Sequence, residues 1–331
     1  MITLRVFESH SFDPRINLAI EEWLLDHTSK DEIWLYLWQN EHTIVLGKNQ
    51  NAWFECNLKA FEEDGGSLVR RLSGGGCVYH DLGNLNFTFF ACENHYDTAR
   101  QTSVLKRALR SFGIEAEVSG RNDVLVDGCK VSGNAYCQRG PKHYHHGTLL
   151  VDCDFSKMAA YLTPHRKKLE AKGVSSVASR VMNLKEAAPD LTIPALKKAL
   201  AKAFEEEYSG EALHKKGDVR EVFPIPVDEL SPLIKKYASE EWTLHSPEPF
   251  TWLSDVVRLS EDPCFGLFQL GISARDGRIV KAVLYTDSLD ETCSLRTEQV
   301  LLSLPFDRDT IKQALNEAGL APLTNLLASF S

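Results

Sequence analysis

The chain has 331 residues, of which 43% are hydrophobic, so it can bury a large core, and at this length we expect two domains. Its formal net charge of −9 argues against general nucleic-acid binding, although it does not exclude a local cationic pocket. No apolar run approaches the roughly 20 residues that a membrane-spanning helix needs, and MITLRVFESHSFDPR resembles neither a signal nor a transit peptide, so we expect a soluble cytoplasmic protein.

Helix and strand patterns are mixed, rather than regularly alternating, along the first 210 residues. An amphipathic helix is predicted at 17–25, and strands are predicted at 34–38 and 43–47. Residues 98–113 predict a helix that ends at its glycine, and 194–208 predict a helix that begins at its proline.

A change of composition suggests where the second domain begins. Five of the thirteen prolines lie between residues 223 and 250, which is typical of a connection or boundary rather than one continuous element. Beyond it, Asp276-Gly277 predicts a hairpin turn, and 307–319 predicts a helix ending at its glycine. We therefore expect a first domain of residues 1–245, with the connection at its end, and a small α/β domain of residues 246–331.

The stretch RRLSGGGCVYHDLGNLNFTFF, residues 70–90, combines paired arginines, three glycines and a strand-like tail. Glycines let backbone N–H groups converge on an anion, and arginines supply cationic forks. The stretch does not match GxxxxGK[ST], and a strand follows it rather than a helix, so a P-loop is not predicted. By itself it also suits a glycine-rich turn with two solvated arginines.

The stretch GRNDVLVDGCKVSGNAY, residues 120–136, predicts a hairpin that turns at Asp127-Gly128. A two-residue turn fixes the expected pairs: Val126 with Cys129, Leu125 with Lys130, Val124 with Val131, and Asp123 with Ser132. Asp123, Lys130 and Ser132 then share one face of the hairpin. On this pattern alone, Lys130 is either a solvated edge charge or a residue that faces a ligand.

Neither the histidines nor the cysteines predict a metal site. His143, His145 and His146 lack both a clear ligand spacing and a fourth ligand for zinc. The eight cysteines have no CxxC spacing, so we expect free thiols rather than a disulfide framework: 56, 77, 92, 129, 137, 153, 264 and 293.

Together with HHGTLL and KKLEAKGVSSVASRVMNL (167–184), these stretches resemble, in order and spacing, the lipoate-protein ligases of the biotin and lipoate ligase superfamily. The resemblance extends from the N-terminus to about residue 208. It implies an α+β fold, with a mixed-sheet catalytic domain and a small C-terminal domain that moves between half-reactions. It also implies the reaction, in which ATP activates lipoate to lipoyl-AMP and the lipoyl group passes to a carrier lysine.

The resemblance also assigns site residues, with Lys130 as the catalytic residue. Lipoate binding is expected at Lys130, Arg71, Gly75, His146 and Gly147. Binding of ATP and lipoyl-AMP is expected at Arg70, Arg71, Ser73, Gly74, Gly75, Gly76, Cys77, Val78, Tyr79 and Lys130, and, in the adenylate-binding loop 173–180, at Ser175, Val177 and Arg180.

The expected cofactor and partners follow from the same resemblance. Mg²⁺ would accompany ATP, and Asp123 is the expected ligand, with Asp81 as the alternative. The expected partner is the apo lipoyl domain of a 2-oxoacid dehydrogenase subunit or the glycine-cleavage H protein, and no nucleic acid or membrane is expected.

Two other functional classes stay open. The same scaffold serves ATP-independent octanoyl or lipoyl transferases, in which a cysteine thiolate carries the acyl group. Cys77 and Cys129 are more simply packing residues, which leaves Cys137 and Cys153 as candidates. The adenylate loop and C-terminal domain favour the ligase, because such transferases lack that domain. The other class is a binding module without turnover, against which the intact Lys130 and glycine motif argue.

Overall fold

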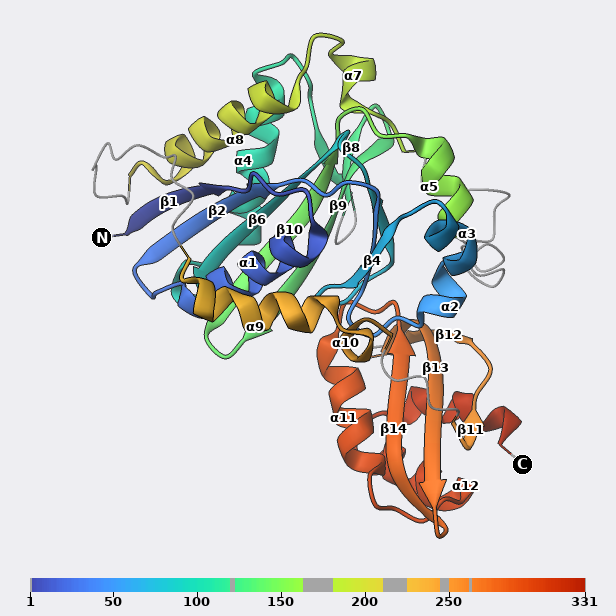
Figure 1. Cartoon of the computed structure of the whole chain (residues 1–331). Helices are drawn as coiled ribbons and strands as arrows, with labels where there is room; N and C mark the ends of the chain where they lie inside the picture. The colour runs from blue at the N-terminus through green and yellow to red at the C-terminus, as the bar shows by residue number, and fades with distance from the viewer. Residues whose placement is uncertain are drawn as a thin grey trace.

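A seven-stranded mixed sheet forms the centre of the larger part of the molecule, shown by the computed structural model in Figure 1. The structure describes residues 2–119, 123–162, 181–210, 225–244, 250–261 and 264–330. The strand order is β1 (Thr3–Glu8), β2 (Glu32–Trp38), β6 (Asn84–Cys92), β10 (Lys142–Leu150), β9 (Cys129–Arg139), β8 (Asp123–Val126) and β7 (Glu117–Ser119). β1 pairs in parallel with β2, and the other neighbours are antiparallel.

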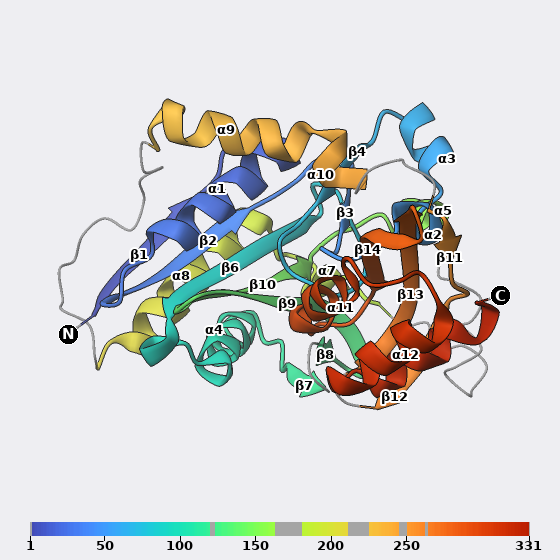
Figure 2. The same ribbon diagram turned by 90° about the horizontal axis from the view of Figure 1, so that it is seen from below.

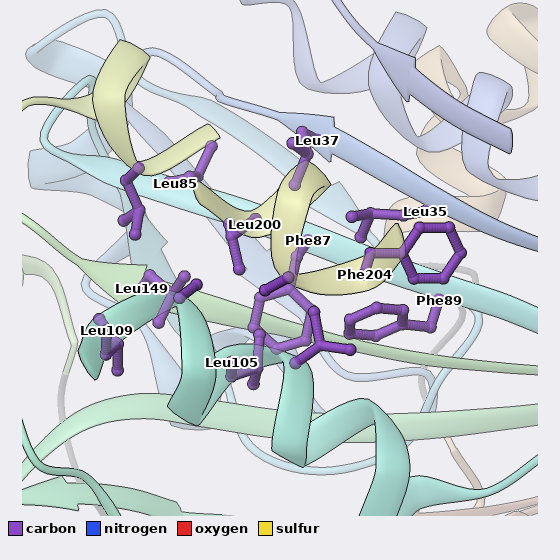
Figure 3. Close-up of a cluster of buried hydrophobic side chains, with 14 of the residues drawn as sticks. Leu35, Leu37, Leu85, Phe87, Phe89, Leu105, Leu109, Leu149, Leu200 and Phe204 are labelled. Carbon is purple, nitrogen blue, oxygen red and sulfur yellow. The ribbon is translucent and has the colours of Figure 1, made fainter. Parts of the chain in front are cut away.

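Helices cover both faces of this sheet, as Figures 1 and 2 show. One face carries α4 (Thr98–Arg110) and α8 (Ile193–Tyr208), and the other carries α1 (Pro14–His27) and α9 (Val227–Ala238). Alternate residues of β2 therefore enter two different cores: Leu35 packs toward α4 and α8, whereas Trp34 and Tyr36 pack toward α1. Figure 3 shows the first of these cores.

A smaller three-stranded sheet lies beside the large one and carries the glycine motif. Its order is β4 (Ser67–Arg70), β3 (Thr43–Leu46) and β5 (Val78–His80). The short helices α2 (Ala52–Glu55), α3 (Leu58–Glu63) and α5 (Phe155–Tyr161) lie nearby, and α7 (Leu184–Ala187) precedes α8. The residues between β4 and β5 form a loop without regular structure; we call residues 73–77 the glycine loop.

Residues 250–261 and 264–330, which we call the C-terminal unit, have a sheet and a core of their own. The sheet consists of β11 (Trp252–Leu253), β12 (Val257–Glu261), β13 (Cys264–Arg275) and β14 (Arg278–Thr286). The helices α11 (Glu291–Leu301) and α12 (Arg308–Glu317) pack with it. Asp276 (φ 53°) and Gly277 (φ 72°) make the predicted hairpin turn, and Gly319 (φ 70°) follows α12 as predicted.

The helices and strands predicted in the first 210 residues are confirmed, but the proline-rich connection also holds two helices that the sequence did not predict. It contains α9 and α10 (Glu240–Leu244), and Pro232 lies inside α9. Tertiary contacts outweigh the lost backbone hydrogen bond. Trp23 Nε1 donates to Glu229 Oε2 at 2.7 Å, and Lys236 Nζ donates to the buried carboxylate of Glu22 at 2.7 Å.

The predicted hairpin forms, but half of its predicted register is wrong. The turn and the first two pairs are confirmed. Beyond them the register shifts, so that Val124 lies opposite Ser132 and Asp123 opposite Gly133. The extra residue of this β-bulge is Val131, which is fully buried in the core beside α4 and α8.

Candidate functional site

A cavity of about 220 Å³ lies where β9 and β10, the glycine loop and the C-terminal unit meet. Nine of the predicted site residues line it: Arg71, Gly75, Gly76, Cys77, Val78, Asp123, Lys130, His146 and Gly147. Four others belong to neighbouring structure and not to the lining, namely Arg70, Ser73, Gly74 and Tyr79. Ser175, Val177 and Arg180 lie outside the described residues.

The glycine loop places bare backbone against this cavity. A Cβ at Gly76 would meet no atom within 4 Å, so this residue borders open space. Gly75 has φ +87°, a conformation that favours glycine. Its carbonyl oxygen would lie 2.0 Å from a Cβ at Gly47, so that glycine is needed for close backbone packing.

Arg71 holds the glycine loop in shape. Its Nη2 donates to the carbonyl oxygens of Gly74 (2.6 Å) and Gly76 (2.8 Å), while its Nε donates to Ser73 Oγ (2.9 Å). The side chain is buried at the edge of the cavity. The positive charge of Arg71 therefore lies at the cavity wall, and its guanidinium group holds the glycine-loop backbone that faces the cavity.

Arg70 is fully buried and bonds only to backbone carbonyls in the interactions described. Nε and Nη2 donate to Thr243 O at 2.9 and 2.6 Å, and Nη1 donates to Gly47 O at 2.9 Å and Gln50 O at 2.7 Å. Burial lowers the pKa of Arg70 to about 9. This arginine ties α10 to the loop after β3 and lies behind the cavity wall.

Lys130 reaches the cavity beside Asp123, and the bulge brings the two together. Their Nζ and Oδ1 atoms form an ion pair at 2.7 Å. A Cβ at Gly133, which lies opposite Asp123, would come within 3.1 Å of Lys130 Nζ. The Lys130 carbonyl accepts from Met182 N at 3.1 Å, which links this strand to the end of the segment that carries the predicted adenylate loop.

A buried polar network joins His146 to both sides of the cavity. Glu21 Oε1 accepts from His146 Nδ1 (2.8 Å) and from Thr88 Oγ1 (2.7 Å). On the other side of the ring, Nε2 lies 2.7 Å from Ser73 Oγ, within hydrogen-bond distance. Ser73 in turn accepts from Arg71, so the carboxylate of Glu21 fixes the ring that supports the glycine loop.

Several cavity residues were missed by sequence reasoning. His80, Asn86, Asn134 and Thr148 line it from β5, β6, β9 and β10. Burial, aided by the charge of Arg71, lowers the pKa of His80 to about 3, so its ring is neutral. The alternating pattern of the strands could have indicated which polar residues face one side, but not that this side borders a cavity.

The C-terminal unit also contributes to the cavity wall, through Asp287 and Leu289. Ser288 O accepts from the Gly75 N–H at 3.1 Å, and Asn49 O accepts from the Thr286 N–H at 2.7 Å. The turn after β14 therefore packs directly on the glycine loop. No local sequence signal connects these two distant segments.

Three of the cysteines weighed as acyl carriers do not line the cavity. Cys137 is buried in the core beside α1, and Cys129 and Cys153 are half-buried. Burial raises the pKa of Cys153. Cys77 lines the cavity, but burial raises its pKa as well, so its thiolate is disfavoured.

The two carboxylates considered for Mg²⁺ have different surroundings. Asp123 lines the cavity, whereas Asp81 accepts from the backbone N–H groups of Gly83 and Asp154, at 2.8 Å each, and does not line it. An oxygen ligand beside a cationic, glycine-lined cavity suits Mg²⁺ bound with phosphates. Within the described ranges, no group of three or more acidic, histidine or cysteine side chains could hold a metal ion.

Comparison with known proteins identifies the family. Residues 13–205 match the model of the lipoyl protein ligase A/B catalytic domain. The chain belongs to the lipoyl protein ligase family. A curated relative, lipoate-protein ligase A of Bdellovibrio bacteriovorus, is 37% identical over 319 residues, which cover 95% of this chain and 92% of the relative. Membership makes the chain an enzyme of the ligase class.

Solved structures of this ligase family share the fold. P. falciparum LipL1, in complex with lipoate, is 27% identical with a TM-score of 0.80, and the match covers 97% of this chain and 98% of that one. A bi-partite lipoate protein ligase from Thermoplasma acidophilum, described with its E2 lipoyl domain, is 25% identical with a TM-score of 0.62; 76% of this chain matches 100% of that chain. The predicted α+β fold class is thus confirmed.

Proposed function

We propose that this enzyme uses ATP to convert lipoate to lipoyl-AMP and then transfers the lipoyl group to a lysine of a lipoyl carrier domain. The observation that carries the proposal is the meeting of Lys130, Arg71 and the bare backbone at Gly76 in one cavity. Family membership supports it, since relatives are named lipoate-protein ligases and one is solved with lipoate.

In the first half-reaction, a lipoate carboxylate oxygen attacks the α-phosphorus of ATP and pyrophosphate leaves. Negative charge grows on the phosphoryl oxygens, and Lys130 Nζ supplies a positive charge from the cavity wall. The buried guanidinium of Arg71 adds a second charge and keeps the glycine loop in position. Such preorganised charges are commonly the largest contribution to stabilising a transition state.

In the second half-reaction, the amine of the carrier lysine attacks the acyl carbon and AMP leaves. No enzyme nucleophile takes part, so no acyl group passes through a cysteine. The same cation that stabilised the forming adenylate stabilises charge on the acyl oxygen and on the departing phosphate. This route agrees with Cys137 and Cys153 lying outside the cavity lining.

Mg²⁺ would be held by Asp123 and by phosphate oxygens of ATP, in keeping with its preference for one or two carboxylates plus phosphates. When bound, it would neutralise phosphate charge. Asp123 also pairs with Lys130, at 2.7 Å, and so sets the position of the ammonium group. The remaining contacts to the adenylate are assigned to Ser175, Val177 and Arg180 by the family resemblance.

We further propose that residues 1–245 form the catalytic domain and residues 246–331 an accessory domain. The separate core of the C-terminal unit supports this division. The proposed acceptor is a lipoyl domain of a 2-oxoacid dehydrogenase subunit or a glycine-cleavage H protein, in line with the E2 lipoyl domain described with the archaeal relative. The proposed location is the cytoplasm; none of the helices described is long and apolar enough to span a bilayer.

The test is to mix the protein with lipoate, Mg²⁺ and ATP labelled at the α-phosphate, without any carrier. We expect lipoyl-AMP on the enzyme and an equal amount of pyrophosphate. Adding an apo lipoyl domain should then discharge the label as AMP. Acylation of the carrier from an octanoyl or lipoyl thioester donor, with no nucleotide present, would instead support the cysteine-dependent transferase.

A further inference from the structure

Two cysteines meet in the wall of the proposed active site. The Sγ atoms of Cys56 and Cys77 are 3.3 Å apart. Cys77 belongs to the glycine loop and lines the cavity, whereas Cys56 is buried at the C-terminal end of α2. Cys77 is among the residues expected from the sequence to bind ATP, with a packing role for its thiol, and the proposed chemistry uses neither thiol.

We propose that Cys56 and Cys77 form a redox modification site, which a small peroxide converts to a disulfide that stops adenylate formation. The inference rests on the proposed function for its effect on activity, but not for the chemistry of the thiols. A disulfide has an S–S bond of about 2.05 Å, so the two sulfur atoms must approach by roughly 1.2 Å.

The reaction balances with hydrogen peroxide as oxidant. The Cys77 thiolate attacks one peroxide oxygen, the O–O bond breaks, and hydroxide leaves, giving a sulfenic acid. The Cys56 thiol then attacks the Cys77 sulfur, the S–O bond breaks, and water leaves. In total, two thiols and one peroxide give one disulfide and two waters, so the two cysteines lose the two electrons that the peroxide gains.

Access decides which thiol reacts first. Cys77 is half-buried and faces the cavity, so peroxide reaches it from there, whereas Cys56 is only 4% exposed and acts as the resolving thiol. Burial raises the pKa of Cys77, with the neighbouring Cys56 thiol contributing in the same direction. The thiolate is the reactive form, so oxidation should accelerate as the pH rises.

The disulfide would displace the part of the loop that meets the ligand. Cys77 directly follows Gly76, which borders open space in the cavity and whose carbonyl accepts from Arg71. Moving a positioned group by about 1 Å can lower a rate by about 100-fold. We therefore expect peroxide to lower the rate of lipoyl-AMP formation at least ten-fold.

A second thiol pair provides an internal control. Cys264 and Cys293 have their Sγ atoms 3.6 Å apart, but they lie in the core of the C-terminal unit and do not line the cavity. Replacing Cys293 removes this pair and leaves Cys56 and Cys77 in place. A Cys293→Ala variant should therefore keep the full response to peroxide.

The experiment treats the full-length protein with hydrogen peroxide, blocks the remaining thiols, and maps disulfide-linked peptides by mass spectrometry. In parallel, it measures lipoyl-AMP formation before treatment, after treatment and after dithiothreitol. We expect a Cys56–Cys77 linked peptide, at least a ten-fold loss of rate, and recovery on reduction. Cys56→Ala and Cys56→Ser, two variants outside the binding machinery, should start with normal activity. Without the resolving thiol, oxidation of Cys77 stops at the sulfenic acid, which dimedone labels, and the rate should fall less than in the wild type.

Two results would overturn the proposal. One is the absence of the Cys56–Cys77 linked peptide in the oxidised wild-type protein. The other is a linked peptide accompanied by an unchanged rate. If the reduced protein makes no lipoyl-AMP at all, the proposed function fails, whereas the peptide map still decides whether the disulfide forms.

Discussion

Replacing Gly76 with alanine should weaken the binding of ATP and lipoyl-adenylate without destabilising the protein. A Cβ at this position meets no protein atom within 4 Å, and Gly76 is not among the glycines with positive φ. In such a position, the alanine should stabilise the fold by about 0.4–1 kcal/mol, because it restricts the unfolded chain.

The unfavourable effect of the Gly76→Ala methyl group should appear only in the free energy of ligand binding. If the adenylate lies against the bare backbone at Gly76, the new methyl group occupies space that the ligand needs. Overpacking of this kind typically costs about 1–3 kcal/mol. At about 1.4 kcal/mol for each factor of ten, Kd should rise about 5- to 140-fold.

Gly75 provides the matched control. Its φ of +87° disfavours alanine, and the added Cβ would lie 3.1 Å from Leu289 Cδ2 and 3.2 Å from Arg71 Nη2. The strained backbone should cost about 1–3 kcal/mol of folding free energy. Gly75→Ala should therefore lower the melting temperature, whereas Gly76→Ala should not.

Calorimetric titration with ATP and with a lipoyl-adenylate analogue, beside thermal unfolding of the free proteins, separates the two effects. If Gly76→Ala binds both ligands as tightly as the wild type, no ligand lies against this backbone. The glycine loop would then be a structural turn, and the adenylate site would have to be sought elsewhere.

Three further predictions use single substitutions. Lys130→Ala should remain folded, as judged by circular dichroism, but lose most lipoyl-AMP formation; a folded variant with wild-type turnover would refute its catalytic role. Arg71→Lys should weaken ATP binding and lower the melting temperature, since an ammonium cannot replace the fork that holds the glycine-loop carbonyls, and unchanged values of both would contradict this. Burial alone would raise the pKa of Glu22, but Lys236 and Arg139 outweigh it and hold the pKa below 4.5. A carboxyl group whose pKa is lower in the folded state stabilises the protein at pH values above its unfolded pKa, and this stabilisation is lost as the pH falls. In urea unfolding, the wild type should therefore exceed Glu22→Gln in unfolding free energy by less at about pH 3.5 than at about pH 7. A difference that stays constant with pH would refute this prediction.

Local signals predicted the elements well, because helix ends and tight turns depend on a few neighbouring residues. Asp276-Gly277 and Asp127-Gly128 make their turns as predicted, since aspartate and glycine tolerate positive φ. The helix α9 was missed because Pro232 signals a break, while the contacts that stabilise the helix come from α1, about 200 residues earlier in the chain. The bulge at Val131 escaped prediction for a similar reason, since burial in a distant core decides it.

The sequence predicted residues that the structure brings together, but not the contacts that each of them makes. Lys130, Arg71 and Gly76 do meet in one cavity. The sequence could not show that Arg71 directs its fork to the loop's own carbonyls, or that Arg70 lies behind the wall. These outcomes depend on which backbone groups remain unpaired after folding, and that is settled only by the tertiary structure.

The measurement that tests the central claim most directly is the intact mass of an apo lipoyl domain after incubation with this protein, lipoate, ATP and Mg²⁺. The account predicts a gain of one lipoyl group on the carrier lysine, with release of AMP and pyrophosphate, and no gain when ATP is omitted or when Lys130→Ala replaces the wild type. A lipoyl domain that gains the same mass without ATP, or that gains none with every component present, would contradict it.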